Sequence, residues 1–228
     1  ISEETIRALP TQNVADLFRG VPGMNVIQTS AREFSVNSRS ASGLLPSALL
    51  ALIDGRTIYA DASAYVNWDS VTKNLDEIKQ VEVIRGPASA IWGANAMNGL
   101  VNIITRPPRE MLGTAFTLGI GTFDRSGGVA ESDRGTLYYA NAMHAQALND
   151  RWAFKISAGA YTQDAFARPQ GTIANPYHTP YPPLINPGTT QPKVDLRADY
   201  DLPDGKQHFA FSGGYSSTSG TLLSDALL

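Results

Sequence analysis

The pattern of hydrophobic and polar positions changes its period near residue 113. Beyond that point, apolar and polar side chains alternate one by one at residues 116–121, 152–161, 193–202 and 208–212. In the second of these segments, Phe154 and Ile156 alternate with Lys155. A period of two predicts β-strands with an apolar face and a polar face. We expect about five antiparallel strands in this half of the chain.

Residues 1–108 lack this alternation and are typical of a mixed α/β region. Thr11 is placed to cap a helix over 12–20, and Asn74 followed by Glu77 predicts a capped helical turn. Short strands are expected at residues 24–27, 34–38 and 49–53. An ordinary small α/β domain would give the same pattern.

Residues 81–105 contain closely spaced glycine, proline and asparagine residues that mark turns and helix ends. A β-branched run at 81–84 predicts a strand, and Gly86 with Pro87 predicts a sharp turn into a helix over 88–92. Gly93 can end that helix, and Asn98-Gly99 predicts a turn into a second strand over 100–104. The segment therefore predicts a compact strand–helix–strand unit.

The connections between the predicted strands alternate in length. Residues 148–151 and 202–206 form short turns, whereas 124–135 and the proline-rich 164–192 are long. This alternation is typical of strands that cross a bilayer, with lipid on the apolar face and a wet lumen on the polar face. A water-soluble sheet with one solvated face would show the same side-chain alternation. An open sheet of five strands would leave two unpaired edges in a bilayer, so we expect this chain to be part of a longer protein that continues at both ends.

Composition excludes several classes of function. The chain has 228 residues, a net charge of −3, no cysteine and three histidines. Without a basic run, a nucleic-acid partner is not expected. The three histidines, His144, His178 and His208, occur in unrelated contexts, so we expect no catalytic site, metal or cofactor, and no enzyme. The sequence contains no apolar run of about 18 residues and opens on polar residues, so neither a spanning helix nor a signal peptide is predicted.

Residues 81–105 resemble the plug-domain signature of TonB-dependent outer-membrane receptors. The matching positions are Glu82, Val83, Arg85, Gly86, Pro87, Ser89, Gly93, Ala96, Gly99, Asn102, Ile103 and Thr105. Three upstream stretches, at residues 9–17, 21–24 and 52–56, also resemble the family, the last through Asp54-Gly55. The resemblance covers residues 1 to about 108 in order.

This resemblance implies a fold class and a function. We expect an α+β plug domain at 1–108, followed at 109–228 by antiparallel transmembrane β-barrel strands. The implied function is import of a scarce nutrient, such as a siderophore, cobalamin, glycan or peptide, across the outer membrane of a Gram-negative bacterium. The implied partners are TonB with its ExbB/ExbD inner-membrane motor, and the surrounding lipid and lipopolysaccharide. The plug would lie inside the barrel, with short turns periplasmic and long loops extracellular. A signalling receptor and a structural component of an envelope complex, with its plug shut, remain alternatives.

The resemblance also assigns roles to residues. Arg85, and Arg39 in a motif where Ser40 replaces the usual glycine, are expected to lock the plug to barrel glutamates. The alternative for Arg85 is a surface position at a strand end. Tyr59, Tyr65 and Trp68 are expected to contact the ligand, or else to pack the plug against the wall.

Overall fold

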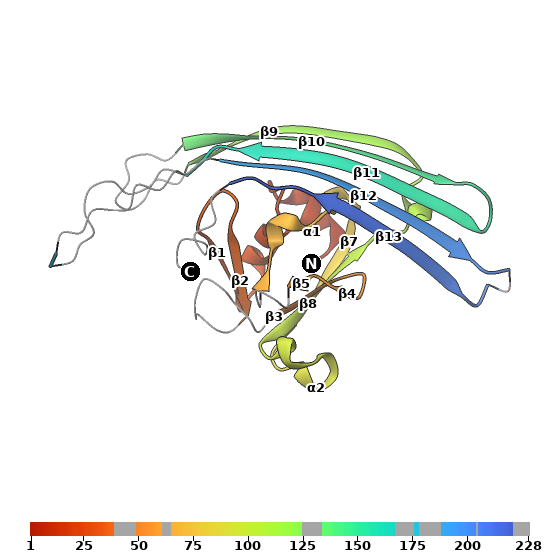
Figure 1. Cartoon of the computed structure of the whole chain (residues 1–228), viewed down its shortest axis with the longest axis horizontal. Coiled ribbons are helices and arrows are strands. Elements are labelled where there is room, and N and C mark those ends of the chain that lie inside the picture. Colours follow the sequence, from red (N-terminus) through yellow and green to blue (C-terminus); the bar gives the residue numbers. More distant parts are fainter. Residues whose placement is uncertain are drawn as a thin grey trace.

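The computed structural model describes residues 1–38, 49–60, 65–124, 134–166, 176–177, 188–203 and 205–220. The chain forms a compact N-terminal lobe, residues 1–110, and a five-stranded sheet that arches over one side of it (Figure 1). The predicted Arg39 lies outside the described residues. Within the described residues, no helix combines the length and apolar character needed to cross a membrane.

The N-terminal lobe is built around a small mixed sheet of order β4-β3-β8-β7, in which β3 runs parallel to β8 and β7 antiparallel to it. Two hairpins, β1-β2 and β5-β6, stand beside this sheet. The elements are α1 (Glu3–Ala8), η1 (Val14–Gly20), β1 (Met24–Gln28), β2 (Phe34–Ser38), β3 (Leu49–Ile53), β4 (Arg56–Thr57), β5 (Tyr59–Ala60), β6 (Tyr65–Val66), η2 (Trp68–Ser70), η3 (Leu75–Glu77), β7 (Ile78–Arg85), α2 (Ser89–Trp92), η4 (Ala94–Ala96), β8 (Gly99–Thr105) and η5 (Pro108–Glu110).

The lobe has its own hydrophobic core. Strands β3 and β8 supply its centre, where Ala51 and Val101 are fully buried. Phe18 of η1 packs on Trp68 with ring centroids 5.2 Å apart. Because this cluster lies within the lobe, the lobe buries apolar surface without needing the strands of the second half.

The helices at the start of the chain differ from the prediction. The helix expected over 12–20 is a 3-10 helix beginning at Val14, and its cap is Asn13, whose Oδ1 accepts from the Ala15 amide at 2.8 Å. Thr11 instead accepts from the Asn13 amide and donates to Asp16. A further short helix, α1, was not predicted from the sequence; its cap is Ser2.

The predicted strand–helix–strand unit is confirmed as β7, α2 and β8. Gly93 ends α2 with a φ of 86°. Gly99 enters β8 with a φ of 146°, and a Cβ at this position would collide with the carbonyl oxygen of Ile84. β7 and β8 lie side by side as an antiparallel pair, so the unit closes on itself and α2 projects away from the arching sheet (Figure 1).

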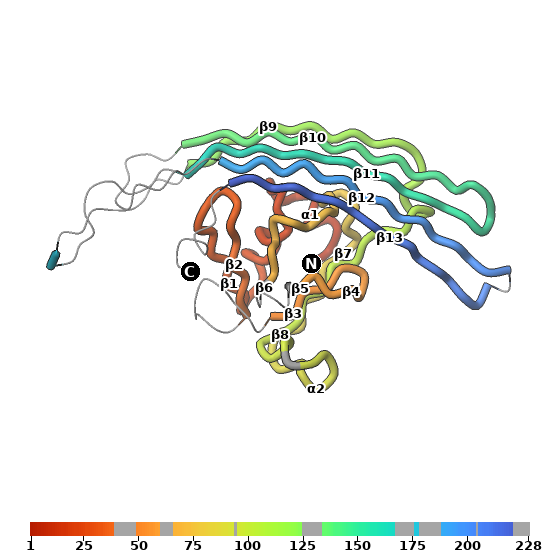
Figure 2. Tube along the Cα trace, in the orientation of Figure 1, coloured from red at the N-terminus to blue at the C-terminus, as the bar shows by residue number. Residues whose placement is uncertain are grey.

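The second half forms the predicted antiparallel strands, β9 (Gly113–Asp124), β10 (Arg134–Ala147), β11 (Trp152–Gln163), β12 (Thr189–Asp201) and β13 (His208–Ser216). Each strand pairs with its neighbour in sequence, in the order β13-β12-β11-β10-β9. Figure 2 shows these long strands running side by side over the N-terminal lobe. Four residues separate β10 from β11, whereas β11 and β12 are separated by residues 164–188, as the alternation of connection lengths predicted.

The polarity of this sheet is reversed relative to a water-soluble protein. Apolar side chains lie on the outer face, where Phe116 and Leu118 of β9 are 77% and 79% exposed. Charged and polar side chains lie on the inner face, where Lys155 and Asp195 are buried against the lobe. A soluble sheet would bury its apolar face. An apolar outer face and a polar inner face favour strands that face lipid.

Candidate functional site

The buried ion pairs between the lobe and the sheet are concentrated on one short segment, residues 69–77, which we call the docking segment. It runs from η2 to η3 and places acidic and basic side chains against the inner faces of β11 and β12. Buried charges are expensive unless each one is paired and hydrogen-bonded. The partners of these charges therefore determine how the lobe is held.

Glu77 is the most deeply buried acid of the docking segment. Its Oε2 lies 2.8 Å from Lys155 Nζ of β11, and both side chains are 1% exposed. Its Oε1 accepts from Ser157 Oγ at 2.7 Å and from the Asn74 amide at 3.1 Å. Burial alone would raise the pKa of Glu77, but the charge of Lys155 and these hydrogen bonds outweigh it and hold the pKa below its ordinary value. Glu77 is thus a carboxylate paired across the interface.

Lys73 and Asp195 make a second buried pair, this time to β12. Thr72 Oγ1 also donates to Asp195, at 3.1 Å. In the opposite direction, Lys193 Nζ of β12 donates to the Lys73 carbonyl oxygen at 2.9 Å. Donors and acceptors therefore come from both sides, which fixes the register of the lobe along the strand.

Asp69 begins the docking segment at the end of the sheet where the long connections lie. Its Oδ1 accepts from Tyr161 Oη of β11 at 2.8 Å, and its Oδ2 accepts from Arg32 Nε at 3.2 Å and from Thr218. Burial raises the pKa of Asp69, and the hydrogen bonds from Thr218, Tyr161 and Arg32 lower it only in part. One carboxyl group thus joins two parts of the lobe to β11 and to the segment after β13.

The side chain of Asn74 packs directly against the backbone of β11. It lies over Gly159 of β11, where a Cβ would collide with the Oδ1 atoms of Asn74 and Asn141. Gly159 is therefore required for the close fit.

The predicted motif residues Asp54 and Gly55 form a turn that touches β12. Asp54 has a φ of 49°, and its carboxylate accepts from the amide and hydroxyl of Thr105 at 2.8 and 2.6 Å. Arg197 Nη1 of β12 lies 3.2 Å from Thr105 Oγ1 and 3.5 Å from Asp54 Oδ2. This turn is a third contact with the sheet, and Arg197 was not predicted to take part in it.

The other motif residues support the lobe itself. Asn102 Oδ1 accepts from the Gly55 amide at 3.3 Å, and Asn102 Nδ2 donates to Glu82 at 3.4 Å. The Gly86 amide, just before Pro87, donates to the Asn98 carbonyl oxygen at 3.2 Å. The motif thus fixes the β7–β8 turn and the β3–β4 turn.

Arg85 is exposed among the described residues and lies at the end of β7. Its Nη1 donates to the Pro22 carbonyl oxygen at 2.5 Å. No contact with β9–β13 is recorded for it in the described part of the chain. The predicted lock of Arg85 to barrel glutamates therefore stays a prediction about strands other than these five.

The three predicted ligand contacts are placed differently from one another. Tyr59 and Trp68 are 8% and 3% exposed and belong to the core of the lobe. Their burial favours packing over ligand contact, although the packing is within the lobe and not against the wall. Tyr65 pairs with Ala60 in the β5–β6 hairpin.

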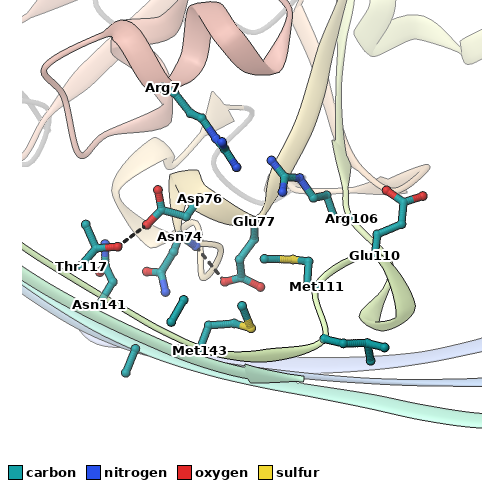
Figure 3. Close-up of a pocket in the computed structure, with 13 residues that line it drawn as sticks. Arg7, Asn74, Asp76, Glu77, Arg106, Glu110, Met111, Thr117, Asn141 and Met143 are labelled. Carbon is teal, nitrogen blue, oxygen red and sulfur yellow. Dashed lines mark hydrogen bonds between the residues drawn. The ribbon is translucent and has the colours of Figure 1, made fainter. Parts of the chain in front are cut away.

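A cavity of about 300 Å³ opens between the lobe and the start of the sheet (Figure 3). Arg7 and Arg106 lie on its lobe side and Met143 on its sheet side. The side chain of Asp76 spans this cavity and accepts a hydrogen bond from Thr117 Oγ1 of β9 at 2.9 Å. Within the described residues, no cluster of three or more histidine or acidic side chains is placed to hold a metal ion.

Comparison with known protein families identifies the family of the N-terminal lobe. Residues 1–100 match the model of the TonB-dependent Receptor Plug Domain. The lobe is a TonB-dependent receptor plug. The plug is followed by antiparallel strands, so the predicted fold class is confirmed.

Curated relatives include receptors for two kinds of nutrient. The chain is 33% identical over 129 residues to the ferric enterobactin receptor PirA of Pseudomonas aeruginosa, covering 52% of this chain and 17% of that protein. It is 30% identical over 122 residues to the vitamin B12 transporter BtuB of Vibrio vulnificus, covering 54% of this chain and 20% of that protein. Both are described as a receptor or a transporter, in line with the expectation of no enzyme.

Solved structures show the same fold over nearly the whole chain. A double mutant of the ferric enterobactin receptor PfeA from Pseudomonas aeruginosa superposes with a TM-score of 0.68 at 22% identity, covering 95% of this chain and 32% of that one. The siderophore receptor PirA from the same species superposes with a TM-score of 0.61 at 22% identity, covering 96% and 35%. The chain therefore spans about a third of the length of these structures. TonB-dependent receptors are outer-membrane proteins of Gram-negative bacteria that interact with TonB.

Proposed function

We propose that the full-length receptor to which this chain belongs imports a scarce nutrient across the outer membrane, with force supplied through TonB and its ExbB/ExbD inner-membrane motor. The observation that carries the proposal is the plug docked on the polar face of strands whose opposite face is apolar. Buried pairs such as Glu77–Lys155 hold it there. A plug held by polar contacts inside a wall that faces lipid closes a pore and can be rearranged to open it.

The proposed topology follows from the strand connections. The short connection between β10 and β11 lies on the periplasmic side, and the long stretches of chain after β9 and β11 lie on the extracellular side. Lipid and lipopolysaccharide surround the apolar outer face. Within this scheme we place the plug at residues 1–108 and the wall at 109–228.

The nutrient is proposed from chemistry shared by the relatives. Those relatives are described as receptors for ferric enterobactin and for vitamin B12, two metal-containing compounds. A metal chelate or a cobalamin is therefore the proposed class of solute. Tyr65 is kept as a candidate ligand contact, and Arg85 and Arg39 as the candidate lock to the rest of the wall.

Uptake measurements test this function. The full-length receptor is expressed in a strain lacking its own siderophore and cobalamin receptors, with and without TonB. Radiolabelled ferric enterobactin and cyanocobalamin are offered first, followed by a panel of other ferric chelates, glycans and peptides. Uptake of at least one solute that requires TonB is expected. If no solute in the panel enters in a TonB-dependent manner, the import proposal is wrong and the shut-plug alternative replaces it.

A further inference from the structure

Three cavities lie one after another along the inner faces of β9 and β10. The first, about 390 Å³, is lined by Thr122 and Leu137 at the long-connection end of the strands. The second, about 220 Å³, is lined by Thr117 and Tyr139. The third, about 300 Å³, continues to Met143 toward the short turns. The cavities therefore follow the wall from one end of the sheet to the other.

The cavities adjoin one another. Leu9 and Thr11, between α1 and η1, line both the first and the second cavity. Arg7, Asp76 and Asn141 line both the second and the third. Thr117 of β9 also lines both the second and the third cavity. Asp76 belongs to the docking segment, so the plug residues whose movement would join the cavities are Arg7, Leu9 and Thr11.

Among the described residues, two polar contacts cross this crevice. Thr117 Oγ1 donates to Asp76 at 2.9 Å, and Asn141 Nδ2 donates to Gln12 at 3.4 Å, a long hydrogen bond. In contrast, the contacts of the docking segment with β11 and β12 include two ion pairs whose side chains are at most 3% exposed. A single hydrogen bond contributes little net stability, whereas undocking a buried ion pair leaves two charges without partners. The plug is thus weakly held at β9–β10 and firmly held at β11–β12.

The plug residues along the crevice follow a segment that is paired with β7, where Ile1 and Val81 exchange backbone hydrogen bonds at 2.6 and 3.0 Å and Ser2 bridges to Gln80. Beyond that pairing, residues 3–8 bury little of their own surface. Helix α1 has six residues and buries one of them, Ile6. Its Arg7 pairs with Glu3 of the same helix, and the two side chains are 58% and 36% exposed. Glu3 also forms an ion pair with Arg106. Among the described residues, this ion pair is the charged contact between α1 and the rest of the plug. A segment with little buried surface opens locally more readily than the core does.

We propose that the solute passes between plug residues 6–12 and the inner faces of β9 and β10, while the docking segment stays seated on β11 and β12. This inference rests on the proposed import function. The first cavity suits an aromatic or aliphatic portion of the solute, because Phe123 and Phe166 meet there edge to face at 5.2 Å. The later cavities suit polar and charged portions, because Arg7, Asp76 and Glu77 line them.

Cysteine accessibility in the full-length receptor tests the path. The 228 residues contain no cysteine, so single substitutions give a clean background within this chain. Thr117→Cys and Asn141→Cys report on the crevice, and Ser157→Cys and Gln191→Cys report on buried positions of β11 and β12. Two reporters on each side keep the test valid if one variant fails to fold. The probe is a biotin maleimide added to intact cells, with and without TonB, and uptake is measured in the same strains.

The path predicts that TonB raises the labelling rate at the crevice reporters about tenfold and leaves the β11 and β12 reporters unchanged. A larger increase at the β11 and β12 reporters, with TonB-dependent uptake intact, overturns the path but not the import function. TonB-dependent uptake without any change in labelling also overturns the path but not the import function. If TonB changes neither labelling nor uptake at any position, the import function itself fails and the path fails with it.

Discussion

Glu77 of the plug and Lys155 of β11 form an ion pair of 2.8 Å in which each side chain is 1% exposed. The pair is surrounded by further hydrogen bonds, from Ser157 to Glu77 and from Lys155 to the Arg106 carbonyl oxygen. Breaking such a pair by removing one partner is far more costly than replacing both partners by neutral groups. Because of this asymmetry, a single and a double substitution at the pair should differ measurably in how strongly the docking segment is held.

Lys155→Ala is expected to weaken docking of the plug by about 3–5 kcal/mol, because Glu77 is left buried without its countercharge. The double variant Glu77→Gln, Lys155→Met is expected to recover most of that loss. The measurement is the urea concentration at which residues 69–77 lose protection from hydrogen exchange in the full-length receptor. The exposed pair Lys79–Glu110, with Nζ and Oε1 2.9 Å apart, serves as control. Lys79→Ala should cost about 0–1 kcal/mol. Equal effects of the two lysine substitutions would contradict the role of burial.

Docking is expected to weaken as the pH falls below 4.5, the ordinary pKa of a glutamate. The pKa of Glu77 is lowered in the docked plug, so its stabilising contribution is present above 4.5 and is lost as the pH falls through the docked value. Lys155 on β11 and Lys193 on β12 are the cations facing it. In Glu77→Gln the same pH titration of hydrogen-exchange protection should be flatter. An unchanged pH dependence in that variant would assign the effect to other carboxylates.

Gly159→Ala is expected to displace the plug from β11, because the added Cβ collides with Asn74 and Asn141. Overpacking of this kind costs about 1–3 kcal/mol. Gly213→Ala in the same sheet is the matched control, since nothing lies within 4 Å of a Cβ there. Hydrogen exchange at residues 72–77 compares the two variants. A loss of protection in Gly213→Ala as large as in Gly159→Ala would show that the close approach of Asn74 is not responsible.

The side-chain pattern predicted the strands well because alternation is a local property. Phe154, Lys155 and Ile156 alternate in the sequence, and they alternate between outer and inner faces in the sheet. The turns at Gly93 and Gly99 were also predictable, since each needs a positive φ that glycine adopts readily. The start of the first helix was misplaced because Thr11 and Asn13 are both competent caps, and the local pattern does not choose between them.

The docking contacts could not be predicted from the sequence alone. Glu77 was recognised as part of a capping box, and it does accept from the Asn74 amide. Its second role depends on Lys155, which only the tertiary fold brings within reach. The one available signal was Lys155 itself, a charge in an otherwise apolar run, which indicated an inward-facing position. For Tyr59 and Trp68 the sequence left ligand contact and packing open, because aromatic residues near a loop fit a core as well as a ligand site.

A pair of reducible cross-links tests most directly whether the plug opens on one side and stays fixed on the other. Gln12→Cys with Asn141→Cys, joined through a short bis-methanethiosulfonate linker that attaches by a reducible disulfide at each end, closes the crevice, where the two native side chains are hydrogen-bonded through their terminal amides. Thr72→Cys with Gly214→Cys ties the docking segment to β13, where a Cβ at Gly214 lies 3.0 Å from Thr72 Cβ. The new Cβ also lies 2.8 Å from Asp195 Oδ2, so the Asp195 side chain must shift to accept it.

TonB-dependent uptake of radiolabelled ferric enterobactin and cyanocobalamin is then compared in cross-linked and reduced cells carrying the full-length receptor. The crevice cross-link should abolish uptake until it is reduced, and the docking disulfide should leave uptake unchanged. Uptake that survives the crevice cross-link but is lost with the docking disulfide would contradict the proposed direction of opening.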